Sequence, residues 1–173
     1  MKAKPCSNSL AVKISQVMPP DTNPHGTLFG GKLMAYIDDV AAIAAIRHAR
    51  ENVVTASTDS IDFIAPVKAG NSICVEAYVT WTHKTSMEIF AKAITEDLIT
   101  GERQVCATAF LTFVAVNEDG RPIPVPPVYP ESEHEKLLHA GAPVRAAQRR
   151  ERRQQSKQFT EIFGTEYPWL RSK

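Results

Sequence analysis

The stretch DTNPHGTLFGGKLMAYIDD, residues 21–39, joins a polar, glycine-rich loop to an apolar segment of helical composition. Two turn-forming pairs, NP and HG, occupy residues 23–26, and Gly30 and Gly31 remove side chains where a backbone must approach another group closely. Loop amides and a helix N-terminus therefore converge on one place, which suits an anion or a developing oxyanion. A plain turn before a buried helix is the simpler interpretation.

The helix expected from Lys32 to Arg50 is apolar around nearly its whole circumference, so we expect it to be mostly enclosed. Asp38 lies inside it, and its neighbours three and four residues away are a methionine and alanines, which cannot neutralise a carboxylate. An unpaired buried charge is costly, so Asp38 needs a partner from another element or an opening to water. Asp39 points about 100° away and is an equal candidate for the exposed acid. Capping of another element's amides is the structural alternative to catalysis.

Composition favours an ordinary globular protein. The chain has 173 residues, 43% of them hydrophobic, and a net charge of +1 that gives no general attraction to nucleic acid or membrane. We expect a cytoplasmic protein without membrane insertion, because no signal peptide or membrane-spanning run is present. The three cysteines lack metal spacing and predict reduced thiols. No zinc spacing, Walker loop or Ser-His-Asp order appears, so we expect no metal.

After the helix the apolar period changes from 3.6 to 2, which predicts strands separated mainly by short reversals. With an opening strand before the helix, the order is strand, helix and four strands. This is an α+β fold with a largely antiparallel sheet around one long helix. The expected strands span residues 10–18, 53–67 and 72–81, then run onward from 86 and over 102–116.

The segment RPIPVPPVYP, residues 121–130, should run as an extended strap over the surface. It should not pair in a sheet, because five of its ten residues are prolines, which have no backbone N–H to donate. Ser132 and Glu135 predict a capping box that opens a short helix. The AGAP sequence at 140–143 should break it, and a second helix should cover 144–158.

The C-terminal tail is basic. From Arg145 to Lys173 it has eight bases and three acids, so it carries +5 and the remainder of the chain −4. A solvated helix face, a phosphate contact and self-association are all compatible with this charge. The Arg run lacks interleaved aromatic residues, so we expect no nucleic-acid partner.

Four strings carry a resemblance to a known family: NPHGTLFGGKLMAYIDDVAAIAAIRH, VVTASTDSIDFIAPVKAG, KTSMEI and FLTFVAV. Together, over Leu10 to Pro127, they resemble the hotdog-fold acyl-CoA thioesterases of the cytosolic acyl-CoA hydrolase type. The resemblance implies a hotdog domain at 8–127, an antiparallel sheet wrapped around one central helix, and a charged helical extension at 128–173. It also implies hydrolysis of fatty acyl-CoA to fatty acid and coenzyme A, with no cofactor, since coenzyme A is part of substrate and product.

The resemblance also assigns residues. The catalytic pair of such enzymes falls on Asn23 and Asp38, because the family motif places its acid seven residues after the second glycine. The N–H groups of Gly30 and Gly31 would polarise the thioester carbonyl. Asp38 would act as general base on water, and direct attack to form an anhydride is the competing mechanism. Asp39 is then a bystander.

Other candidate residues have plain alternatives. Lys84, Thr85 and Ser86, after His83, resemble the segment that holds the pantetheine or phosphates of coenzyme A, and a solvated hairpin tip is the alternative. His25 is a candidate substrate contact or a merely solvated turn residue. Three side chains are expected to share one face of their strand, where they would line the groove or form its wet side: Thr55, Ser57 and Asp59.

Spacing adds a prediction about assembly. Asp38 lies eight residues past Gly30, roughly 12 Å along a helix, too far for both to engage one carbonyl carbon. The Asn23 loop of one subunit and Asp38 of another should therefore meet across a two-fold dimer. The family resemblance adds a continuous sheet across the dimer and a trimer of dimers, or hexamer. A non-catalytic acyl-CoA-binding regulatory module and a hotdog dehydratase using His25 with Asp38 are the alternative functions.

Overall fold

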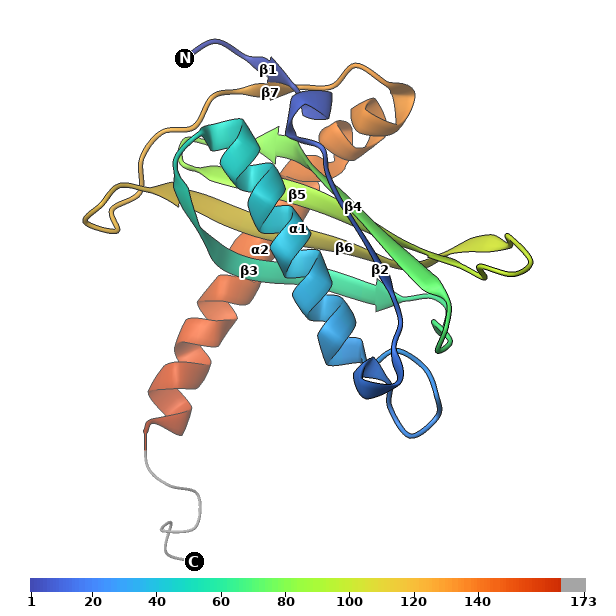
Figure 1. Cartoon of the computed structure of the whole chain (residues 1–173). Coiled ribbons are helices and arrows are strands. Elements are labelled where there is room, and N and C mark those ends of the chain that lie inside the picture. The colour runs from blue at the N-terminus through green and yellow to red at the C-terminus, as the bar shows by residue number, and fades with distance from the viewer. Residues whose placement is uncertain (166–173) are drawn as a thin grey trace, which may run out of the picture. The chain divides into compact units, whose positions relative to one another are not determined.

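The computed structural model describes residues 1–165, in which one long helix, α1 (Gly30–Ala49), lies across a five-stranded antiparallel sheet (Figure 1). The predicted order of strand, helix and four strands is confirmed. The strand order in the sheet is β2-β4-β5-β6-β3, with every neighbouring pair antiparallel. These strands are β2 (Ala11–Gln16), β3 (Asn52–Phe63), β4 (Ser72–Thr82), β5 (Ser86–Glu96) and β6 (Arg103–Val116).

Smaller elements flank this sheet: two 3₁₀ turns, η1 (Cys6–Ser9) and η2 (Pro19–Asp21), and two short strands, β1 (Lys4–Pro5) and β7 (Val128–Tyr129). β1 and β7 pair in parallel. The expectation that the proline-rich segment cannot pair is therefore wrong at its end. Val128 and Tyr129 lie between prolines but keep their own N–H groups, so two residues suffice for a short ladder.

The C-terminal helix, α2 (Glu133–Phe163), is continuous, so the predicted break at 140–143 is wrong. Pro143 lies inside the helix and removes one backbone bond, while the alanines around it favour helix strongly. The capping box is confirmed: the Glu135 N–H donates to Ser132 Oγ (3.3 Å), and the Ser132 N–H donates to Glu135 Oε2 (2.9 Å). The chain divides into two compact units, Met1–His139 and Ala140–Lys173.

Three charged residues of the predicted basic tail, Glu166, Arg171 and Lys173, lie outside the described residues. No helix within residues 1–165 is long and apolar enough to cross a membrane. The three cysteines are unpaired, and two of them, Cys6 and Cys106, are fully buried.

The core lies between α1 and the inner face of the sheet, where alternate strand residues point toward the helix. Its largest fully buried side chains include Ile37 and Val40 of the helix and Val75, Val79, Met87, Ile89, Leu111 and Phe113 of the strands. The helix itself is not enclosed all round, contrary to expectation. Met34, Ile43 and Ile46 are 44–47% exposed in the single chain, so α1 presents apolar side chains outward at more than one place on its circumference.

His48, in the last turn of α1, fastens the proline-rich strap to the helix. Its side chain is 1% exposed, and its Nε2 lies 2.8 Å from the carbonyl oxygen of Pro126. Because a carbonyl only accepts, Nε2 carries the proton of the neutral ring. Burial lowers the pKa of His48, and the positive charge of Lys4 acts in the same direction, while the bond to Pro126 opposes them.

This burial predicts a pH-dependent stability. The unfolded chain takes up a proton on His48 below a pKa of about 6.5, whereas the folded chain resists it until a lower pH. His48 therefore supports folding fully above that value and less as the pH falls toward its folded pKa. In urea unfolding at about pH 7.5 and about pH 5.5, the His48→Gln variant should lose less stability on acidification than the wild type. Equal losses in the two proteins would contradict this assignment.

Candidate active site

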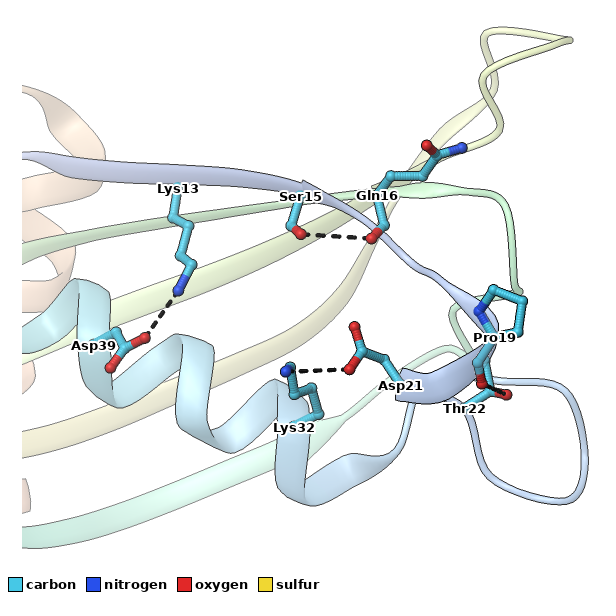
Figure 2. Close-up of polar contacts among 8 residues, drawn as sticks. All are labelled: Lys13, Ser15, Gln16, Pro19, Asp21, Thr22, Lys32 and Asp39. Carbon is cyan, nitrogen blue, oxygen red and sulfur yellow. Dashed lines mark hydrogen bonds and ion pairs between the residues drawn. The ribbon is translucent and has the colours of Figure 1, made fainter.

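The two ends of the loop between η2 and α1 are joined by a hydrogen bond and an ion pair. The N–H of Phe29 donates to the Asp21 carbonyl (2.9 Å), and Lys32 Nζ lies 3.1 Å from Asp21 Oδ1 (Figure 2). Within the loop, Gly26 has a φ of +72°, a left-handed conformation that favours glycine. Thr27 forms an isolated bridge with Lys68, so the loop is also attached to the segment after β3. The segment is thus held in one shape before the helix starts.

Asn23 is oriented by its own loop. Its Oδ1 accepts hydrogen bonds from the backbone N–H groups of His25 (2.9 Å) and Thr27 (3.3 Å), which fixes which end of the amide is oxygen. Its Nδ2 donates to Thr27 Oγ1 at 2.9 Å. An amide nitrogen has two hydrogens, so one donor of Asn23 stays available to a substrate or a water. The side chain of His25 is exposed.

The first amides of α1 follow directly after this loop. The N–H groups of Lys32 and Leu33 both donate to the Phe29 carbonyl, at 2.9 and 3.2 Å. The amides of Gly30 and Gly31 come before these and have no partner within the helix. They are therefore the donors that the helix N-terminus offers to a developing negative charge, together with its dipole.

The two acids of α1 have different surroundings. Asp38 is half-buried, and its Oδ1 accepts a hydrogen bond from Thr55 Oγ1 of β3 at 3.1 Å. The Asp39 side chain is 60% exposed and pairs with Lys13 Nζ of β2 at 2.8 Å (Figure 2). Asp38 thus has both the partner and the opening to solvent that its place in the helix requires. The partner of Asp38 is a neutral hydroxyl, whereas the partner of Asp39 is a cation.

A β-bulge decides which β3 side chains reach the helix. Thr55 pairs with Phe113 and Ser57 pairs with Thr112, so Ala56 is an extra residue in β3. Phe113 is buried on the helix side of the sheet, and its neighbour Thr112 points to the other side. Thr55 therefore faces α1 and Ser57 faces away.

The expectation that Thr55, Ser57 and Asp59 share a face is thus wrong. Ser57 Oγ donates to Asp59 Oδ1 at 2.7 Å, and Thr112 Oγ1 donates to Asp59 Oδ2 at 2.9 Å, all on the outer side. The alternation of the sequence could not reveal the bulge, because alanine at position 56 is not a residue type that marks bulges. Thr55 is the site residue that the sequence did not single out from this group.

The predicted coenzyme A segment is a tight turn between β4 and β5. The His83 N–H donates to the Ser86 carbonyl (2.9 Å), so Lys84 and Thr85 form the tip. The Lys84 carbonyl accepts from Val125 of the strap (3.1 Å), and the Thr85 carbonyl accepts from the end of β6 (3.1 Å). The Lys84 side chain is exposed. The turn is therefore braced on two sides while its cation stays free to meet an anion.

Within one chain the candidate residues form two groups. Met87, next to the turn, pairs with Phe113, which pairs with Thr55, so Lys84, Thr85, Ser86 and Asp38 lie toward one end of β3. Gly30 lies against Phe63 at the other end, since a Cβ on this glycine would be 3.6 Å from the phenyl ring. Thr55 pairs with Phe113 and Phe63 with Ala107, six positions apart on β6, which is roughly 20 Å along the sheet. Asn23, His25 and the glycines therefore do not meet Asp38 in the single chain.

Among residues 1–165, no group of three or more His, Cys, Asp and Glu side chains is placed to hold a metal ion.

Several known proteins are similar to this chain in sequence and in structure. The thioesterase superfamily model matches residues 25–102. The chain is 53% identical over 164 residues to YkhA of Bacillus subtilis, named an uncharacterized acyl-CoA thioester hydrolase, and the match covers 95% of each chain. A Staphylococcus aureus acyl-CoA hydrolase, solved with butyryl coenzyme A and coenzyme A, has a TM-score of 0.89 at 44% identity, covering 94% of this chain and 99% of that one. A hexameric acyl-CoA thioesterase has a TM-score of 0.86 at 45% identity, covering 88% and 97%.

Structures of the Staphylococcus aureus hydrolase with single replacements by alanine are also similar to this chain. The replaced residues are an asparagine, an aspartate and a threonine. They are separated by 15 and 17 positions, which are also the separations of Asn23, Asp38 and Thr55.

Proposed function

The chain belongs to the acyl-CoA thioester hydrolases of the thioesterase superfamily, and from this premise we propose that it hydrolyses fatty acyl-CoA at sites that two subunits complete. The observation that carries the proposal is Asp38, a half-buried carboxylate that is held by a hydroxyl and not by a cation. The matching separations of Asn23, Asp38 and Thr55 in the Staphylococcus aureus hydrolase support the choice of these three residues.

The reaction needs an activated water and a place for the oxyanion. Asp38 accepts a proton from water as the water oxygen bonds to the thioester carbon. The carbonyl oxygen becomes an oxyanion, held by the amides of Gly30 and Gly31, while the free Nδ2–H of Asn23 orients the water or the thioester. Collapse of the tetrahedral intermediate breaks the C–S bond. The thiolate of coenzyme A leaves and receives the proton from Asp38, so fatty acid and free thiol are the products.

Two subunits complete each site in this proposal. Asp38 lies on the side of α1 that also exposes Met34, four residues before it, an apolar side chain that a second copy would cover. β3 is an edge strand, so its free backbone can pair with the same strand of a partner. A two-fold axis there would bring the Asn23 loop of one subunit to Asp38 of the other. The hexameric relative supports further assembly into a trimer of dimers.

The coenzyme A part of the substrate is assigned to the braced turn. Lys84 offers a point charge to a phosphate, and the Thr85 and Ser86 hydroxyls offer shorter-range hydrogen bonds. His25, exposed on the loop half of the site, is the contact proposed from the other subunit. No cofactor enters this mechanism, and we place the reaction in the cytoplasm, where the three unpaired thiols would stay reduced.

Release of free thiol from a panel of acyl-CoAs, followed with a thiol reagent, tests the function. Burial raises the pKa of Cys6 to about 12 and that of Cys106 to about 11, and it also raises the pKa of Cys74, so the protein's own thiols contribute little near neutral pH. Thiol release above background from at least one chain length is expected. Acyl-CoA binding without any release would instead establish a binding module.

Replacing each acid in turn separates the two roles. Asp38→Asn should lower kcat about 10²–10⁴-fold, because it removes the base, while the assembly state stays unchanged. Asp39→Asn should stay within about twofold, because it removes only an exposed ion pair worth at most about 1 kcal/mol. Thiol-release kinetics and size-exclusion chromatography report both quantities. Full activity in Asp38→Asn would refute the assignment.

Thr27 should act through Asn23. Thr27→Val keeps the shape but removes the hydroxyl that holds Nδ2, so kcat should fall about tenfold with little change in KM. Thr27→Ser keeps the hydroxyl and should restore most of the rate. In an Asn23→Ala background, Thr27→Val should have no further effect on kcat. Additive losses in the double variant would show that Thr27 only supports the loop.

A further inference from the structure

A pocket of about 200 Å³, lined by apolar side chains together with backbone, opens beside the start of α1. Its floor is made by Leu28, Leu33 and Val67, which are 7%, 3% and 3% exposed. Its rim is made by Phe63 and Ile64, which are 56% and 60% exposed. All these residues belong to the first compact unit, so the pocket is a feature of the domain itself.

The pocket shares one residue with the proposed oxyanion site. Gly30 lines the pocket, and its amide is one of the two that the helix start offers to the oxyanion. A thioester oxygen bound to that amide places the carbonyl carbon at the pocket, and the alkyl chain starts at the next bond. From this continuity we propose that the pocket receives the acyl chain and that Phe63 limits its length; the proposal rests on the proposed function.

The volume indicates which chains fit. An apolar cavity of about 150 Å³ holds a six-carbon benzene molecule, so about 200 Å³ corresponds to about eight carbons at the same packing. Short and medium chains of up to about eight carbons fit inside. A longer chain has to pass the rim, where the Phe63 ring stands 3.6 Å from the position of a Cβ on Gly30.

Hydrogen bonds hold the walls of the pocket in place, so that they can limit the length of the acyl chain. The Leu28 N–H donates to the Val67 carbonyl (2.7 Å), and the N–H groups of Ile64 and Ala65 both donate to the Cys106 carbonyl (2.8 and 3.2 Å). Floor and rim are therefore tied to each other and to β6. A packed apolar wall of this kind discriminates about 10–200-fold for each methylene that it rejects.

Two substitutions should shift the preferred chain length in opposite directions. Phe63→Ala opens the rim and should raise kcat/KM for dodecanoyl-CoA relative to hexanoyl-CoA at least tenfold. Ala65→Leu adds a side chain on the pocket wall and should lower kcat/KM for octanoyl-CoA relative to butanoyl-CoA at least tenfold. Phe159→Ala, which alters a phenylalanine of similar exposure (54%) in α2, is the control and should leave both ratios unchanged.

The outcomes separate this proposal from the proposed function. Active Phe63→Ala and Ala65→Leu variants with wild-type ratios would overturn the acyl pocket, and so would the same shift in Phe159→Ala. A wild-type protein that releases no thiol from any acyl-CoA would overturn the function instead. Circular dichroism and size-exclusion chromatography verify folding and assembly, and Phe63→Leu, a smaller change in the same direction, replaces Phe63→Ala if that variant does not fold.

Discussion

The fixed rise of α1 sets the geometry on which the proposed chemistry depends. Gly30 begins the helix and Asp38 lies more than two turns later, a separation of roughly 12 Å that no side-chain rotation can close. The sheet keeps the same two groups apart, because Phe63 lies against Gly30 and Thr55 bonds to Asp38 at different positions along β3. In the proposed mechanism a single chain therefore carries two halves of a site, each built by a different part of the same helix.

The β-bulge in β3 determines which hydroxyl contacts Asp38. The extra residue Ala56 turns Thr55 toward the helix and Ser57 away from it, so one strand serves both faces of the sheet. Without the bulge, the strict alternation of a strand would place both hydroxyls on the same side. Thr55 gives Asp38 a neutral hydrogen-bond donor, whereas Asp39 pairs with the cation of Lys13, and this difference is the reason for proposing Asp38 as the base.

Periodicity was enough to predict the main elements, because the 3.6-residue pattern of α1 and the alternation in the strands reflect burial directly. Periodicity failed where a single residue decides the local structure. The bulge at Ala56 has no sequence signal, Pro143 looks like a helix breaker but is outweighed by its alanine neighbours, and Val128 and Tyr129 pair despite adjacent prolines. The Gly-Gly loop and Asp38 could be selected from sequence, but the hydroxyl partner Thr55 depends on a register that only the folded sheet defines.

The central claim is that Asn23 and Asp38 act in the same site from different subunits. Co-expression of Asn23→Ala and Asp38→Ala chains, each inactive alone, tests it directly, since a mixed dimer would hold one site with both native residues and one with neither. Randomly mixed subunits should recover about one quarter of the wild-type kcat per subunit, because half of the dimers are mixed and each has one intact site of two. If each chain holds a complete site, mixing the two inactive variants will recover nothing, and that result would contradict a site shared between subunits.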